Sequence, residues 1–173
     1  MTTSHVNPIA QLMGEYSKED VAYGKYLCAR CVDDAFTNNG FMGSSMRLSL
    51  TAGNAITHKA PACLAAPRIQ MMAQNIINLG EPEMQTTPTR IYAPLKLTLE
   101  AKHVVIGNIR LVVEPKNGAI VCDKLTLSKS KNSEEDPDHF EIVKSWIIEE
   151  YTTEVEIVCS EAKTEPLSTE RVL

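Results

Sequence analysis

The stretch TRIYAPLKLTLEAKHVVIGNIRLVVEP, which spans Thr89–Pro115, carries the clearest structural signal in this chain. Apolar and polar residues alternate without a break from Arg90 to Lys102, and this period of two is typical of a strand with one buried face. The predicted buried residues of that strand are Ile91, Ala93, Leu95, Leu97, Leu99 and Ala101. A second apolar segment follows Gly107-Asn108 and ends at Pro115. We therefore predict two long antiparallel strands at the centre of the fold.

Three further segments fit the same sheet. Met46–Ala52 alternates in the same way, and Ala119–Ser128 follows Asn117-Gly118, a dipeptide typical of a tight hairpin turn. Thr152–Ser160 alternates again near the C-terminus. The central strand, the hairpin and its partner strand would form an antiparallel meander.

Helices are predicted on both sides of these strands. Ser17-Lys18-Glu19-Asp20 offers a hydroxyl for the N-cap and acids for the first turn, and small or apolar residues then recur at helical spacing as far as Ala35. Phe140–Tyr151 fits a second helix, although its β-branched centre also fits a strand. Arg68–Leu79 likewise fits either a short helix or a strand.

These elements predict an α+β fold, in which an N-terminal amphipathic helix packs on an antiparallel sheet and a second helix lies near the C-terminus. The alternative is an all-β sandwich with peripheral helices. A chain of 173 residues is long enough to bury a core of its own, so we expect a single domain over 1–173, with polar tails at 1–7 and 161–173.

Composition restricts the kinds of partner. The apolar fraction of 43% and the charged fraction of 23% are those of a globular protein. Only 5% of the residues are aromatic and the net charge is −5, and both values argue against nucleic-acid binding, which relies on stacking rings and a basic field. We expect no nucleic-acid partner.

The sequence also bears on location. The N-terminus has neither a basic segment nor an apolar run typical of a secretory signal, and no apolar run approaches the roughly 20 residues of a membrane-spanning helix. The five cysteines form an odd and scattered set rather than a disulfide framework. The expected location is the cytoplasm or another reducing compartment.

Charge is distributed unevenly along the chain. Residues 1–88 sum to −1, residues 89–131 to +5, and residues 132–173 to −9. Opposite charges on the outward faces of the central and last strands would guide subunit association. The predicted interface residues are Arg90, Lys96, Lys102, Glu154 and Glu156.

Cys28 and Cys31 form the one short motif that resembles a reactive site. Inside a helix the two thiols would share one face, which is most often a packing arrangement but also allows thiol redox chemistry. Together with His58 and Cys63, the two cysteines could form a zinc site of three Cys and one His. The second pair of ligands, however, lacks the short spacing that is typical of structural zinc sites.

The sequence shows no catalytic motif, and we expect no enzyme activity and no cofactor. The predicted function is that of a structural or interaction protein whose partners are other copies of itself, in a homo-oligomer or larger assembly. Two alternatives remain: a small-molecule-binding or thiol-redox module centred on Cys28 and Cys31, and a zinc-stabilised adaptor.

Overall fold

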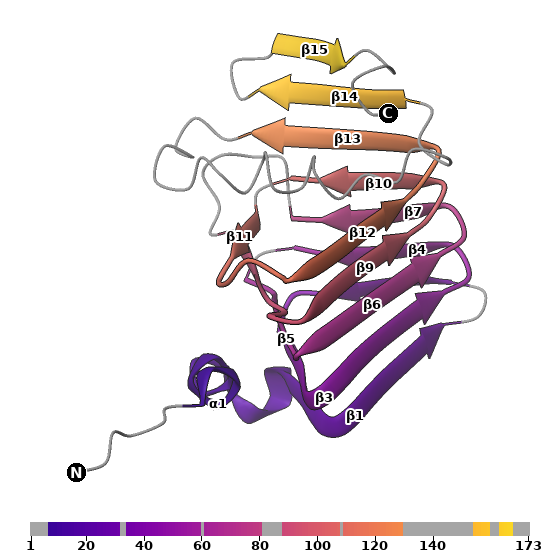
Figure 1. Ribbon diagram of the computed structural model, residues 1–173. Helices are drawn as coiled ribbons and strands as arrows, with labels where there is room; N and C mark the ends of the chain where they lie inside the picture. Colours follow the sequence, from indigo (N-terminus) through magenta and orange to yellow (C-terminus); the bar gives the residue numbers. More distant parts are fainter. Residues whose placement is uncertain are drawn as a thin grey trace.

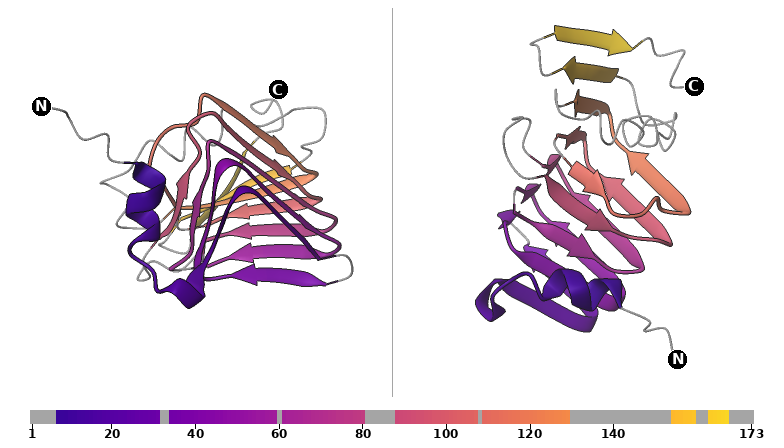
Figure 2. Two further views of the ribbon diagram at one scale, coloured as in Figure 1. Left: turned by 90° about the horizontal axis from the view of Figure 1, so that it is seen from below. Right: turned by 90° about the vertical axis from the view of Figure 1, so that its left-hand side faces the viewer.

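The chain folds into a β-solenoid, in which successive coils stack so that strands one coil apart pair side by side in parallel (Figure 1). The computed structural model spans the whole chain. It describes residues 7–31, 34–59, 61–80, 88–107, 109–129, 154–159 and 163–167. Seen along the stack, the coils have a triangular outline with three faces (Figure 2, left).

One sheet of eight strands forms the first two faces, because its two longest strands run along both of them. These long strands are β1 (Val21–Cys31) and β3 (Phe41–Ala52). The first face continues with β5 (Cys63–Ala65), β8 (Thr89–Tyr92) and β11 (Ile109–Leu111). The second face continues with β6 (Arg68–Ala73), β9 (Lys96–Glu100) and β12 (Asn117–Val121).

A buried serine sits where β3 passes from the first face to the second. The Ser44 hydroxyl oxygen accepts hydrogen bonds from the backbone N–H groups of Met46 at 3.1 Å and Arg47 at 3.0 Å. The same hydroxyl donates a hydrogen bond to the backbone carbonyl of Lys25. These bonds satisfy backbone groups where the chain bends, and a buried polar group that is paired in this way carries little penalty. The corner is therefore specified by one side chain.

The third face is a sheet of seven strands. Its members are β2 (Ala35–Asn38), β4 (Ala55–His58), β7 (Ile76–Leu79), β10 (His103–Ile106), β13 (Lys124–Lys129), β14 (Glu154–Cys159) and β15 (Lys163–Leu167). Within the described residues every strand pair is parallel except the last, because β15 runs antiparallel to β14.

A coil takes about 21 residues. Arg47 pairs with Arg68, and Lys96 pairs with Asn117, 21 positions further along in each case. Arg68 and Lys96 are 28 positions apart, because residues 81–87 lie within that coil. In the described part of the chain, five coils comprise β1–β2, β3–β4, β5–β7, β8–β10 and β11–β13, and β14 stacks in parallel on β13 beyond them.

Side chains that point inward stack in columns and form one continuous core. Leu50, Met71 and Leu99 are register neighbours on the second face, and each is at most 1% exposed. On the third face the corresponding column is Ile56, Ile77, Val104 and Leu125. Burial of each such side chain contributes about 1.5–3 kcal/mol relative to exposure.

The predicted N-terminal helix over Ser17–Ala35 is wrong. The capping signal is used by a single 3₁₀ turn, Lys18–Asp20, where the Ser17 hydroxyl bonds the Asp20 carboxylate at 2.9 Å. The chain then enters β1, which pairs with β3 along nearly its whole length. Backbone pairing with a strand 20 residues away outweighs a local helical pattern. Within the described residues the α-helix is α1 (Pro8–Met13), capped by Asn7.

The predicted antiparallel meander is also wrong, and with it the α+β fold and the sandwich alternative. Asn117-Gly118 is not a hairpin turn but the start of β12, which runs parallel to β9. The predicted central strand Arg90–Lys102 is divided into β8 and β9, with Pro94 at the corner between the two faces. Arg68–Leu79 forms β6 and β7 rather than a helix.

Several burial predictions are nevertheless confirmed. Ile91, Ala93, Leu97, Leu99 and Ala101 are buried, while Leu95 at the corner is half-buried. The predicted strand Met46–Ala52 forms the second part of β3. Phe140–Tyr151 lies outside the described residues. In the part of the chain that the structure describes, no helix has the length and apolar character needed to cross a bilayer.

Candidate functional site

The first coil, β1 with β2, has a stacked neighbour on one side only. β1 pairs with β3 and β2 pairs with β4, and within the described residues no strand lies along their other edges. The inward side chains of this coil are only half-buried: Leu27, Ala29 and Phe36. Their register partners in the second coil are at most 1% exposed: Leu48, Leu50 and Ile56. The difference in burial comes from the missing neighbour.

Helix α1 does not cover this end of the solenoid. Ile9 and Leu12 pack against Phe41, Cys63 and Ala65, which lie on the outer side of the first face. Seen from below, the helix lies beside the triangular outline and not across it (Figure 2, left). Within the described residues, no strand therefore pairs with the backbone N–H and C=O groups along the outer edge of β1.

The opposite end of the stack differs on the third face, whereas the first and second faces end in β11 and β12, each with one paired neighbour within the described residues. The last described strand, β15, has five residues and runs antiparallel to β14. It contains Pro166, paired in register with Glu156, and proline has no N–H to donate to a further strand. Short edge strands that carry proline discourage the addition of another chain.

The contact between α1 and the first face is reinforced by an ion pair. The Arg90 guanidinium donates to both carboxylate oxygens of Glu15, at 2.8 and 3.3 Å, and to the Tyr16 hydroxyl at 3.2 Å. Tyr16 in turn donates to the carbonyl of Pro61. The hydrogen bond to Glu15 raises the pKa of Arg90, and burial raises the pKa of Tyr16. These groups hold the helix in place.

His58 points into the solenoid interior and is fully buried. Its Nδ1 accepts a hydrogen bond from the Asn38 amide nitrogen at 3.3 Å, which leaves the ring proton on Nε2, and Nε2 has no hydrogen-bond partner among the described residues. Burial lowers the pKa of His58 to about 3, so the ring is neutral at ordinary pH. A neutral ring enclosed in this way does not reach solvent as a general base.

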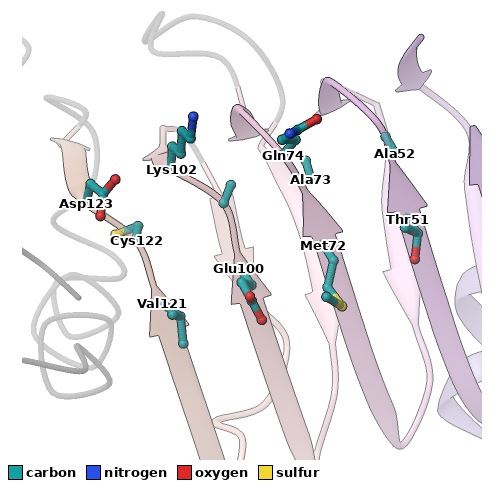
Figure 3. A pocket seen from close by; sticks show the side chains of 11 residues that line it. Thr51, Ala52, Met72, Ala73, Gln74, Glu100, Lys102, Val121, Cys122 and Asp123 are labelled. Atoms are coloured by element: carbon teal, nitrogen blue, oxygen red, sulfur yellow. The ribbon is translucent and has the colours of Figure 1, made fainter. Parts of the chain in front are cut away.

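A groove of about 390 Å³ follows the corner between the second and third faces (Figure 3). Its charged side chains are Glu100, Lys102 and Asp123, and Glu100 and Lys102 point away from one another. The groove is open, and its lining also includes Cys122. Among the described residues, no three His, Cys, Asp or Glu side chains gather as a metal site would require.

The four candidate zinc ligands occupy different surroundings. Cys28 is exposed on β1, His58 is in the interior, and Cys63 is buried under α1, where burial raises its pKa to about 11. Cys31 is the last residue of β1 and pairs with Ala52. Because Cys28 and Cys31 lie in a strand, they lack the common helical face on which the packing interpretation depended.

The predicted interface residues lie on all three faces of the solenoid. Arg90 is engaged with Glu15 on the first face, Lys96 is exposed on the second, and Lys102 is at the corner groove. Glu154 and Glu156 belong to β14 on the third face, in register with Lys124 and Thr126 of the same chain. That these five residues form a subunit interface stays a prediction.

Comparison with known proteins adds no relative: no family model, curated protein or solved structure matches this chain. The solenoid and its free first coil are therefore the basis for a functional hypothesis. Sequence reasoning missed that edge because β1 was interpreted as a helix. The signal that could have found it is the recurrence of alternating segments about 21 residues apart.

Proposed function

We propose that this protein is a non-enzymatic structural or interaction protein that self-associates through the free edge of its first coil. The observation that carries the proposal is the outer edge of β1, 11 residues long, which has no partner strand in the described part of the chain and lies beside an interior that is only half-buried. A long unpaired edge is a template for strand addition, and a second coil stacked on it would bury Leu27, Ala29 and Phe36.

The two ends of the stack favour a closed dimer over a filament. Head-to-tail growth would bring β2 of one copy against β15 of the next, because both belong to the third face, and Pro166 in β15 opposes that pairing. Pairing of two first coils uses the same edge twice, and two-fold symmetry makes the two β1 strands antiparallel. The expected product is a head-to-head dimer with β1 at its centre.

Light scattering on a sizing column tests the proposal directly. The native chain should run as a dimer that dissociates on dilution. Leu27→Lys places a charge on the half-buried interior of the first coil, and an inward charge at a strand edge should shift the equilibrium to monomer. Tyr26→Lys is the matched control, because Tyr26 is the adjacent residue, is 64% exposed and lies outside the core.

Hydrogen exchange provides a readout that does not depend on the variant folding. In the native protein, the amides of β1 should gain protection as concentration rises through the association range, while those of β6 should stay protected throughout. A chain that remains monomeric at all concentrations, with β1 protection unchanged, would reject self-association through this edge.

A further inference from the structure

The second face of the solenoid carries a column of three cations. Arg47, Arg68 and Lys96 are register neighbours on β3, β6 and β9, and all three are exposed. Adjacent strands lie about 4.8 Å apart, so the positive charges are closely spaced. Within the described residues none of the three makes an ion pair. Three like charges at this spacing repel one another unless an anion lies among them.

The rest of this face is also positive, although the chain as a whole is not. Along β1, β3, β6, β9 and β12 the charged residues with described side chains are Lys25, Arg30, Arg47, Arg68, Lys96 and Glu100. Five cations and one acid give this face a charge opposite to the net −5 of the chain. A positive field confined to one face orients an anionic partner toward it.

Large apolar side chains are exposed beside the same cations. Tyr26 is 64% exposed and is the register partner of Arg47, and Met46 next to Arg47 is 44% exposed. Lys25 Nζ lies 5.9 Å from the centre of the Tyr26 ring. Tyrosine combines an apolar ring with a polar tip and is enriched at the level of lipid headgroups.

A hollow of about 400 Å³ runs between the cation column and the neighbouring polar column. Its lining includes the three cations together with Gln70 and Thr98. An amide N–H and a hydroxyl next to guanidinium and ammonium groups are the donors that a phosphate takes up. The described residues of the lining include no acidic side chain that would oppose an anion.

We propose that this second face binds the surface of a bilayer that contains anionic phospholipids, with lipid phosphates beside Arg47, Arg68 and Lys96. A soluble linear polyanion would engage the cations but would gain nothing from exposed Tyr26 and Met46. A bilayer interacts with both sets of residues, because the anionic headgroups bind the cations while Tyr26 and Met46 insert at the boundary between headgroups and acyl chains. This surface uses outward side chains of β1, such as Tyr26, whereas the proposed self-association uses the backbone edge and the inward side chains of that strand.

The test is co-sedimentation of the full chain with vesicles of phosphatidylcholine mixed with phosphatidylserine, and with vesicles of phosphatidylcholine alone. Binding should require phosphatidylserine and weaken as salt is added. The triple variant Arg47→Gln, Arg68→Gln, Lys96→Gln should partition about a hundredfold more weakly, since each cation near an anionic leaflet contributes about a fivefold factor.

A matched triple variant on other parts of the surface controls for net charge. Lys18→Gln, Lys59→Gln and Arg110→Gln remove the same number of exposed cations and should bind nearly as tightly as the native chain. Tyr26→Ser with Met46→Ser should weaken binding by a factor that persists at high salt, because that contribution is apolar. Both apolar side chains are exposed, so these changes should leave the fold intact.

Three results would overturn the proposal. One is equal vesicle binding by the two triple variants. Another is no binding to vesicles with phosphatidylserine. The third is tight binding to heparin or inorganic phosphate together with no vesicle binding, which would identify the column as a site for soluble anions.

Discussion

The middle coils and the first coil of this solenoid are built from the same alternating strands, yet their interiors differ. In the middle coils, Met71, Ile77 and Leu99 are fully buried, because each has a neighbour on both sides. In the first coil, Leu27 and Phe36 are half-buried and Asn38 supplies a polar group that reaches His58. In a stack of this kind each coil contacts only its neighbours, so the free energy of unfolding is approximately a sum over the coils and the interfaces between them. A coil at the end of the stack has one such interface instead of two.

The largest expected effect on the free energy of unfolding comes from truncating a core residue of a middle coil, compared with the same change in the first coil. Leu99→Ala should lower the free energy of unfolding by about 2–5 kcal/mol, because Leu99 is fully buried and its removal leaves a cavity. Leu27→Ala should cost clearly less at concentrations where the chain is monomeric, because Leu27 is already half solvated. Urea unfolding of both variants measures the difference, and equal losses would show that the first coil is covered in solution.

The next effect is the dependence of stability on pH that arises from His58, which lies in the second coil. The folded chain keeps His58 neutral, with its pKa lowered to about 3, whereas the unfolded chain protonates the ring below about pH 6.5. Protonation therefore favours the unfolded state. Stability should fall as the pH drops from 6.5 toward 3, by roughly 1.4 kcal/mol per unit from this group.

His58→Leu should remove that part of the pH dependence, since Leu79 and Ile106 occupy the same column one and two coils further along. Thermal unfolding of both proteins between pH 7 and pH 4 is the measurement. Parallel pH profiles for the variant and the native chain would show that His58 does not contribute.

A smaller effect is expected where α1 joins the first face. Glu15→Gln removes the ion pair with Arg90 from a partly exposed site, and such pairs contribute about 0.2–1 kcal/mol. The loss should diminish at high salt. Glu19→Gln is a suitable control, because Glu19 is exposed and makes no ion pair within the described residues. A salt-independent change of several kcal/mol would mean that Glu15 has another role.

The smallest effect on stability is expected at the exposed end, at Cys28. Cys28→Ala should change the free energy of unfolding by less than about 0.5 kcal/mol, as for most exposed positions. In the native chain Cys28 should react quickly with an alkylating reagent, while Cys63, buried and with its pKa raised to about 11, should react only on unfolding. Mass spectrometry of the alkylated peptides compares the two thiols.

The sequence allowed the burial pattern to be predicted but not the pairing of the strands. Alternation from Ile91 to Ala101 identifies the inward side chains correctly, because a period of two holds in any strand. It does not indicate whether the neighbouring strand is parallel, and Asn117-Gly118 suggested a hairpin where the chain starts β12. The alternation of residues within one strand does not identify a partner strand 21 residues away.

The repeat itself is concealed by its irregularity. Leu48, Ile69 and Leu97 are successive register partners, but their spacings are 21 and 28, so a search for one fixed period fails at residues 81–87. The self-association hypothesis came from strand edges and charge, and the structure suggests a different edge for it. The cation column could have been found only once Arg47, Arg68 and Lys96 were aligned by coil.

Because successive coils stack in parallel, the length of the molecule can be changed by adding a coil. Thr89 pairs with Ile109, so residues 89–108 correspond to one complete step of the stack. Duplicating that segment would insert a step without altering the residues that face one another above and below it, and would lengthen the body by one inter-strand spacing of about 4.8 Å. Chains of graded length could then hold two attached groups at separations that increase in equal increments.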